Sequence, residues 1–268
     1  MLPTPEHQAL VDAIVRALAA DPEIEAAWLG GSLGRGVGDE FSDVDVVALV
    51  ANAPATGVGM RYSGDIASIA EPALVNALYG GGVINVVTID WRRFDINFIE
   101  RGELTRFNAT HLISLFNKSG CSPPEEEPRP YEVTPAVLLK LVNEFLRILG
   151  LLPGGIGRKE FLLGLSGVDI LRRLTVDLML EENGVGPTER GGALRRDPFL
   201  TPDQRSDLAK LAPVTADREG IIAANAELAA IFLPRARRLA DKIGMEWPAV
   251  FETATKRHLH DRVGLVIT

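Results

Sequence analysis

Residues 30–45 read GGSLGRGVGDEFSDVD. This stretch joins two short apolar runs that predict β-strands, Ile24 to Leu29 before it and Asp43 to Val50 at its end. Side chains two positions apart point to the same face of a strand, so Asp43 and Asp45 share a face while their valine neighbours point to the core. An otherwise apolar strand has no structural reason to begin with two carboxylates on one side. The stretch therefore predicts an acidic site at the start of a buried strand.

The spacing of Asp43 and Asp45 suits divalent cations. Their Cα atoms are expected to lie ~6–7 Å apart along a strand, and carboxylates at that spacing can flank two ions that are ~3.5–4 Å apart. Like charges this close repel each other unless a cation neutralises them. We therefore expect these two residues to ligate Mg²⁺.

The glycine-serine corner at the other end of the stretch suits phosphate. Gly31 and Ser32 follow the first predicted strand and open a short turn or helix. Glycine lets a backbone approach a phosphate closely, and free N–H groups at a helix start attract an anion. The Ser32 hydroxyl adds a donor, and Arg35 is the nearest fixed positive charge, for which a phosphate role and a surface role are both open. A phosphate site at one end of the stretch and a Mg²⁺ site at the other together predict a site for a Mg²⁺–nucleotide complex.

Other nucleotide and metal motifs are absent from the sequence. No Gly-Lys-Ser/Thr follows the glycines, which excludes a P-loop. The glycines at positions 31, 34, 36 and 38 do not reproduce the dinucleotide fingerprint G-x-G-x-x-G in a βαβ context. The single cysteine, Cys121, excludes an intrachain disulfide and a cysteine-based zinc site.

A Gly-Ser pair followed by ten residues and then Asp-Val-Asp resembles the signature of the polymerase-β-like nucleotidyltransferase superfamily. Enzymes of this superfamily bring a third carboxylate from a neighbouring strand. In residues 93–98, RFDINF, the apolar side chains alternate inward and leave Asp95 on the other face. The region around it is similar to the third-aspartate region of antibiotic nucleotidyltransferases, with Asp90 as the rival candidate. The motif resemblance covers about residues 24–100.

The pattern of apolar residues predicts an α+β chain with two domains. The first, residues 1–122, is expected to be a nucleotidyltransferase domain in which helices flank a small mixed sheet. Besides the two strands above, it predicts helices over Glu6–Ala20 and Ser68–Tyr79 and strands over Val83–Ile89, Phe94–Glu100 and Leu112–Phe116.

A linker over residues 123–133 is expected next, because the stretch KSGCSPPEEEPR (residues 118–129) is too rich in proline and glutamate to bury apolar surface. The apolar pattern of residues 134–268 predicts an all-helical domain, for which the resemblance implies substrate binding. Its helices are expected to begin at Thr134-Pro135 and to cover Arg158–Glu182, Thr201–Leu211, Asp217–Ile243 and Trp247–Leu259. This layout is similar to that of aminoglycoside and lincosamide nucleotidyltransferases.

The resemblance implies Mg²⁺-dependent transfer of a nucleoside monophosphate, AMP from ATP or the equivalent from another nucleoside triphosphate, to a hydroxyl of a small molecule such as an aminoglycoside or lincosamide. Asp43 and Asp45 would hold two Mg²⁺ ions, and Asp95 would ligate the second ion and receive the acceptor proton. Gly31 and Ser32 would bind the β- and γ-phosphates.

Four residues of the second domain are further candidates. Lys140 is a candidate for the phosphate tail, and Glu144, Arg158 and Glu160 are candidates for substrate binding. Each of them alone is more typical of a solvated helix face or a helix ion pair than of a ligand contact. Two other functions stay open: a protein-modifying AMP transferase of antitoxin-like or regulatory type, and a nucleotide-binding protein without catalysis.

Composition limits the partners. With 46% hydrophobic residues the chain has enough apolar material for a core. A net charge of −8 argues against a protein that coats nucleic acid, because neutralising phosphates requires an excess of Lys and Arg. No run approaches ~20 consecutive apolar residues, so no membrane span is expected. The lone cysteine and the absence of a signal-peptide pattern predict a cytoplasmic protein.

Overall fold

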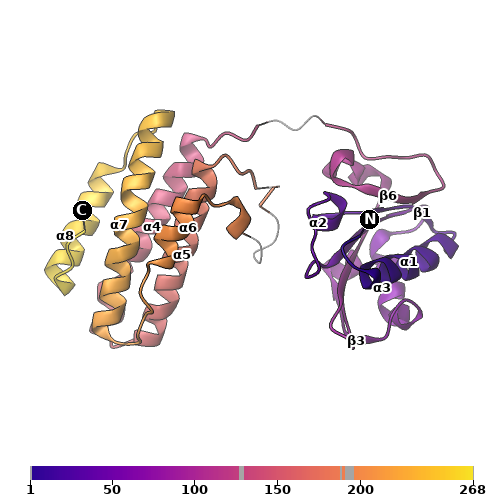
Figure 1. The fold of residues 1–268 in the computed structure, drawn as a ribbon, viewed down its shortest axis with the longest axis horizontal. Helices are drawn as coiled ribbons and strands as arrows, with labels where there is room; N and C mark the ends of the chain where they lie inside the picture. Colours follow the sequence, from indigo (N-terminus) through magenta and orange to yellow (C-terminus); the bar gives the residue numbers. More distant parts are fainter. Residues whose placement is uncertain (1, 127–129, 188, 191–195, 268) are drawn as a thin grey trace. The chain divides into compact units, whose positions relative to one another are not determined.

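The computed structural model describes residues 2–126, 130–187, 189–190 and 196–267. The chain divides into two compact units, Met1–Pro128 and Arg129–Thr268 (Figure 1). Residues 127–129, which belong to the predicted linker, lie outside the described part of the chain.

The first unit is built on one mixed sheet of six strands. In space the strands follow the order β3-β4-β5-β2-β1-β6. The central strands β2 and β5 run parallel, and every other neighbouring pair is antiparallel. The strands are β1 (Ile24–Leu29), β2 (Val44–Val50), β3 (Pro72–Leu78), β4 (Val83–Thr88), β5 (Arg93–Ile99) and β6 (Ile113–Asn117).

Helices α1 (Pro5–Ala20) and α3 (Ala55–Asp65) cover one face of this sheet (Figure 1). The alternating residues of β2, β4 and β5 that point to this face are fully buried against them. On the opposite face, a smaller apolar cluster around Trp28, Leu49 and Leu104 covers the β1–β2 side. The short elements are α2 (Gly31–Gly34) and 3₁₀ turns at Ile66–Ser68, Tyr79–Gly81, Arg101–Arg106 and Ala109–His111.

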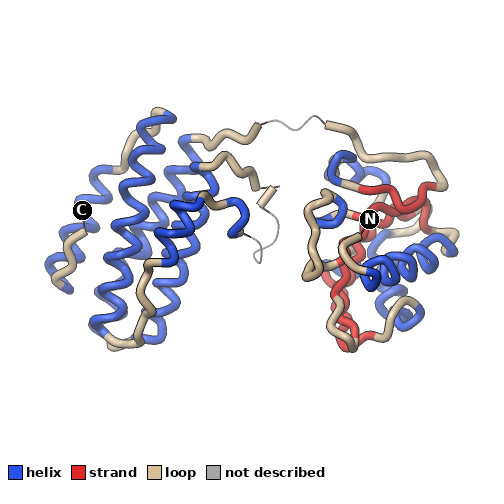
Figure 2. The backbone as a smooth tube through the Cα atoms, in the orientation of Figure 1, coloured by secondary structure: helices blue, strands red, loops and turns tan. Residues whose placement is uncertain are grey.

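The second unit has only helices and loops in its described part (Figure 2). Side chains from its long helices form a large core, in which the rings of Phe145 and Phe232 stack with centroids 3.8 Å apart. Thr134 and Asp217 cap two of the helices by accepting backbone N–H groups. The helices are α4 (Pro135–Gly157), α5 (Phe161–Glu182), α6 (Pro202–Ala209), α7 (Arg218–Ile243) and α8 (Ala249–Val263), with a 3₁₀ turn at Asp197–Phe199.

The predicted α+β class is confirmed: a mixed sheet with helices precedes an all-helical part. One predicted element is wrong, the helix over Ser68–Tyr79. Most of this stretch forms the edge strand β3, which pairs antiparallel with β4 across the glycines at 80–82. Its alanines and leucines favour a helix locally, but the pairing with β4 overrides that preference.

Helix α3 was not predicted, because its sequence ATGVGMRYSGD contains three glycines that weaken an isolated helix. Tertiary packing stabilises it instead. Val58 and Tyr62 are buried against the sheet. Gly59 lies so near the carbonyl of Gly81 that a β-carbon on Gly59 would come within 1.8 Å of that oxygen. None of the helices in the described part of the chain combines the length and the apolar character needed to span a lipid bilayer.

Candidate functional site

Two carboxylates stand side by side at the centre of the sheet. Asp45 on β2 pairs in register with Asp95 on the parallel neighbour β5. The residues that precede them, Val44 and Phe94, are fully buried under the helices, so both carboxylates emerge on the opposite face. Asp43 lies two residues before Asp45, at the entrance to β2.

The three carboxylates repel one another. Burial, reinforced by the negative charges of Asp43 and Asp95, raises the pKa of Asp45 to about 6, against the lowering effect of Arg35 and Arg93. Burial also raises the pKa of Asp95, which Asp43 reinforces. A cation bound between these groups would relieve the repulsion and favour their charged forms.

The glycine-serine corner touches this acidic group. The Gly30 N–H donates to the backbone carbonyl of Asp45 over 2.8 Å. Gly31 has a φ of +59°, and a β-carbon on it would lie 1.7 Å from Oδ2 of Asp45. Both the left-handed backbone and the missing space therefore require glycine.

Ser32 lies within the short helix α2, and Arg35 caps its C-terminal end. Ser32 is half-buried within α2, and its carbonyl accepts a hydrogen bond from the Val37 N–H over 3.0 Å. Arg35 ends α2, and its positive charge lowers the pKa of Asp45. The structure thus gathers Gly31, Arg35 and Asp45 in one site, while their roles toward a phosphate stay predictions.

A buried histidine, which the sequence did not mark as part of the site, anchors the chain just before Asp43. Nε2 of His7 lies 2.9 Å from the carbonyl oxygen of Ser42, and Nδ1 lies 2.9 Å from the hydroxyl of Thr4. A neutral ring protonated at Nε2 satisfies both contacts, donating to Ser42 and accepting from Thr4. His7 therefore fixes the position from which Asp43 enters the site.

A second residue that the sequence did not mark is Asn85 on β4, whose amide donates to Oδ1 of Asp95 over 2.7 Å. Asn85 and Asp95 are also register partners in the antiparallel pair β4–β5. The predicted hairpin, with strands over Val83–Ile89 and Phe94–Glu100, did not give this register, because β4 ends at Thr88 and β5 begins at Arg93.

The rival candidate Asp90 belongs to the turn of this hairpin. Its carboxylate accepts a hydrogen bond from Thr88 and forms an ion pair with Arg92 at 2.6 Å. The hydrogen bond from Thr88 lowers the pKa of Asp90. The Asp90 carboxylate therefore stabilises the turn of the hairpin and is not part of the face that carries Asp45.

The donor set fits magnesium that arrives with a phosphate. Within the described ranges, no three His, Cys, Asp or Glu side chains are arranged as a ready-made metal cage. Mg²⁺ is usually held by one or two carboxylates, waters and substrate phosphates rather than by an all-protein cage. Mg²⁺ prefers carboxylate oxygens as ligands. Here they lie beside the glycine-serine corner, where a phosphate could contact the backbone.

The other four candidates belong to the second unit. Lys140 and Glu144 lie on α4, and Arg158 and Glu160 lie at the end of α4 and the start of α5. The Glu144 carboxylate is held by two 2.7 Å hydrogen bonds from Arg147, which lower its pKa. Contact of these four residues with a substrate stays a prediction.

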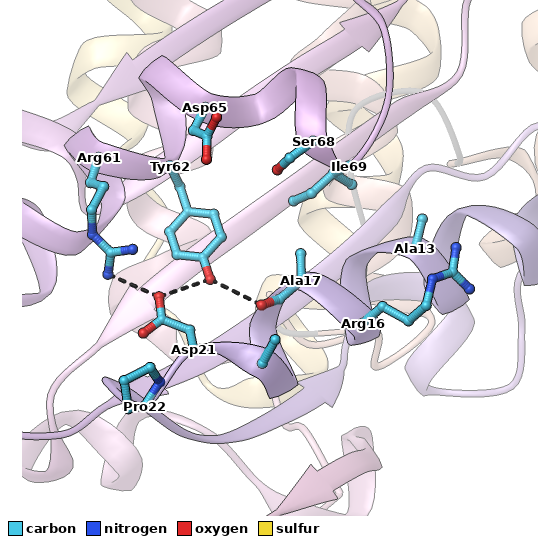
Figure 3. A pocket seen from close by; sticks show the side chains of 11 residues that line it. Ala13, Arg16, Ala17, Asp21, Pro22, Arg61, Tyr62, Asp65, Ser68 and Ile69 are labelled. Atoms are coloured by element: carbon cyan, nitrogen blue, oxygen red, sulfur yellow. Dashed lines mark hydrogen bonds and ion pairs between the residues drawn. The ribbon is translucent and has the colours of Figure 1, made fainter.

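A cavity of about 570 Å³ lies between α1 and α3, on the helix-covered side of the sheet (Figure 3). Its polar groups bind one another: Asp21 accepts hydrogen bonds from the Tyr62 hydroxyl at 3.0 Å and from Arg61 at 2.9 Å. The sheet separates this cavity from the carboxylates, so it is not part of the candidate site. It is lined by Ala13, Arg16, Ala17, Ala20, Asp21, Pro22, Arg61, Tyr62, Asp65, Ser68 and Ile69.

No family model and no curated protein matches the chain. Among solved structures, an aminoglycoside 6-adenyltransferase from Bacillus subtilis is 14% identical, with 94% of this chain and 97% of that one covered and a TM-score of 0.44. An apo CCA-adding enzyme is 13% identical, covering 96% of this chain and 68% of that one, with a TM-score of 0.36. A Thermotoga maritima CCA-adding enzyme complexed with tRNA is 14% identical, covering 96% and 70%, with a TM-score of 0.35. The TM-scores of these three structures are all below 0.5.

Proposed function

We propose that the chain is a Mg²⁺-dependent nucleotidyltransferase that moves AMP from ATP to a hydroxyl group of a small molecule. The observation that supports this most strongly is the pairing of Asp45 with Asp95 on parallel strands, with Asp43 two residues earlier. The contact of Gly31 with Asp45 adds a corner where a phosphate can approach the same carboxylates.

The residues divide the work by their chemistry. Asp43 and Asp45 would hold two Mg²⁺ ions and Asp95 would hold one of them. Bound there, the ions supply neutralisation of the triphosphate and a lower pKa for the acceptor hydroxyl. Asp95 would also take the proton of that hydroxyl. Gly31 and Ser32 would bind the β- and γ-phosphates through backbone N–H groups and the hydroxyl.

The proposed reaction balances as a displacement at phosphorus. The acceptor oxygen forms a bond to the α-phosphorus while the bond from that phosphorus to the bridging oxygen breaks. Pyrophosphate leaves with that oxygen, and the acceptor proton passes to Asp95. Holding the reactants in line and offsetting their charge supply most of the acceleration in such a transfer.

An aminoglycoside or a lincosamide antibiotic is the acceptor class that we propose. The protein carries a net charge of −8, which attracts a cationic acceptor such as an aminoglycoside. Both classes offer hydroxyl groups that can receive the nucleoside monophosphate.

The test is to incubate the purified full chain with ATP labelled at the α-phosphate, Mg²⁺ and a panel of both antibiotic classes. Label on a small molecule supports the proposal and identifies the acceptor. Label on protein would instead indicate a protein-modifying AMP transferase. Retained ATP binding with no label on any acceptor would indicate a nucleotide-binding protein without catalysis.

A further inference from the structure

A row of polar side chains crosses the open face of the sheet at the level of the carboxylates. Asn76 on β3, Asn85 on β4, Asp95 on β5 and Asp45 on β2 are successive register partners. Within this row the Asn85 amide donates to Oδ1 of Asp95 over 2.7 Å. The Asn76 amide nitrogen lies 3.5 Å from Oδ1 of Asn85.

We infer that Asn85 is a positioning residue that orients the Asp95 carboxylate for its ligand, an inference that rests on the proposed function. The terminal torsion of an aspartate is broad, so an unrestrained carboxylate presents either oxygen. The hydrogen bond from Asn85 occupies Oδ1 of Asp95. Oδ2 is then the oxygen that Asp95 presents to the proposed cation. Hydrogen-bond partners of this kind commonly set the orientation of a metal-binding carboxylate.

An amide suits this position better than a charged side chain. A lysine would donate the same hydrogen bond, but its charge would neutralise the carboxylates and weaken their attraction for a cation. Asn85 donates without adding charge to a site that already holds Asp43, Asp45 and Asp95. Its own oxygen faces the Asn76 amide, which fixes which end of the amide points to Asp95.

The chain offers a matched control. Asn97 lies two residues beyond Asp95 on the same face of β5 and is likewise half-buried, but its register partner on β4 is Val83. An asparagine that served only the packing or solvation of this face would be equivalent at positions 85 and 97. If Asn85 is a positioning residue, substitution at position 85 should affect the site more than substitution at position 97.

The experiment measures Mn²⁺ binding by electron paramagnetic resonance, in the full chain with a nonhydrolysable ATP analogue. Asn85→Ala is expected to weaken Mn²⁺ binding by about 10-fold or more, while Asn97→Ala stays within about twofold of the wild type. Should the alanine variant lose its fold, Asn85→Val carries the same test, because valine favours a strand and has no donor. Asp45→Asn and Asp95→Asn report whether the carboxylates bind the ion at all.

The outcomes distinguish the positioning role of Asn85 from the proposed function. Wild-type affinity in Asn85→Ala together with weak binding in Asp95→Asn would overturn the positioning role and leave the proposed function standing. Wild-type affinity in both aspartate variants would instead remove the metal site and, with it, the proposed function. Equal weakening in Asn85→Ala and Asn97→Ala would assign the effect to the sheet face in general and would also overturn the inference.

Discussion

Asp45 and Asp95 face the same side of the sheet because β2 and β5 run parallel and pair these two residues in register. The parallel pair is the only one in the described sheet, and it joins two strands that are separated in sequence by a helix and a hairpin. Backbone pairing keeps the two acidic residues at adjacent positions, so their backbones cannot move apart to relieve the repulsion. The fold therefore maintains a negative charge that a divalent cation can offset.

The first prediction concerns the cost of this repulsion. Asp45→Asn should stabilise the metal-free protein at pH 7.5 by on the order of 2 kcal/mol. The folded protein raises the pKa of Asp45 to about 6 from its usual value of 3.8. A raised pKa means that the folded state binds the proton more tightly, so the penalty grows as the pH rises from about 4 to 6 and is complete above that range. Chemical denaturation in EDTA measures the free energy of unfolding.

The same series at pH 3.5 is the control, because Asp45 is then largely protonated in both states and the difference should largely disappear. Added Mg²⁺ and nucleotide should stabilise the wild type more than the variant. A metal-free variant that is less stable than the wild type at pH 7.5 would contradict the electrostatic account.

The second prediction concerns the glycine-serine corner. Gly31→Ala should destabilise the protein by at least about 2 kcal/mol, because alanine disfavours the left-handed backbone and its β-carbon would collide with Asp45. Gly36→Ala is the matched control. Gly36 has a similar φ of +71°, and beyond its two chain neighbours no atom of the described residues lies within 4 Å of the place where its β-carbon would be. Only the backbone cost of about 1 kcal/mol is therefore expected there.

Urea denaturation of the two variants separates the collision from the backbone strain. The account requires a clearly larger loss for Gly31→Ala than for Gly36→Ala. Equal losses would mean that Gly31 does not press against Asp45 in solution.

The third prediction concerns the network in the cavity between α1 and α3. Burial raises the pKa of Asp21, but hydrogen bonds from the Glu23 N–H, Arg61 and Tyr62 outweigh it and leave the pKa below its usual value. A lowered pKa contributes stability that is present above the usual pKa of about 4 and is lost as the pH falls below it. Asp21→Asn should therefore cost about 1–3 kcal/mol at pH 7, with the gap closing toward pH 2.

Asp65→Asn is the control, because Asp65 lines the same cavity but is exposed (Figure 3). Thermal or urea unfolding across the pH range should show little effect of this substitution. The network would be refuted as a stabilising element by an Asp21→Asn gap that stays constant from pH 7 to pH 2.

Alternation along each strand made much of the first unit predictable. The buried strand that carries Asp45, and a second strand whose apolar residues flank Asp95, could be read from the sequence with their faces correct. The order of the strands could not. That β2 neighbours β5, and so brings Asp45 to Asp95, depends on pairing between segments about 50 residues apart.

The sequence did not predict β3 and α3 because both depend on contacts with other segments. The edge strand β3 exists because β4 supplies its hydrogen bonds, and α3 exists because the sheet buries Val58 and Tyr62. Local propensity contains neither contact. The contact of His7 with the site could not be predicted either, since its partner Ser42 lies 35 positions away in sequence.

The central claim is that Asp43, Asp45 and Asp95 together support Mg²⁺-dependent transfer. It is tested most directly by the rate at which the α-phosphate label of ATP reaches the acceptor, in the wild type and in the three aspartate-to-asparagine variants at saturating Mg²⁺. The account predicts a metal-dependent rate in the wild type and a loss of at least about 10³-fold in each folded variant. A folded Asp45→Asn or Asp95→Asn variant that transfers the label at the wild-type rate would contradict it.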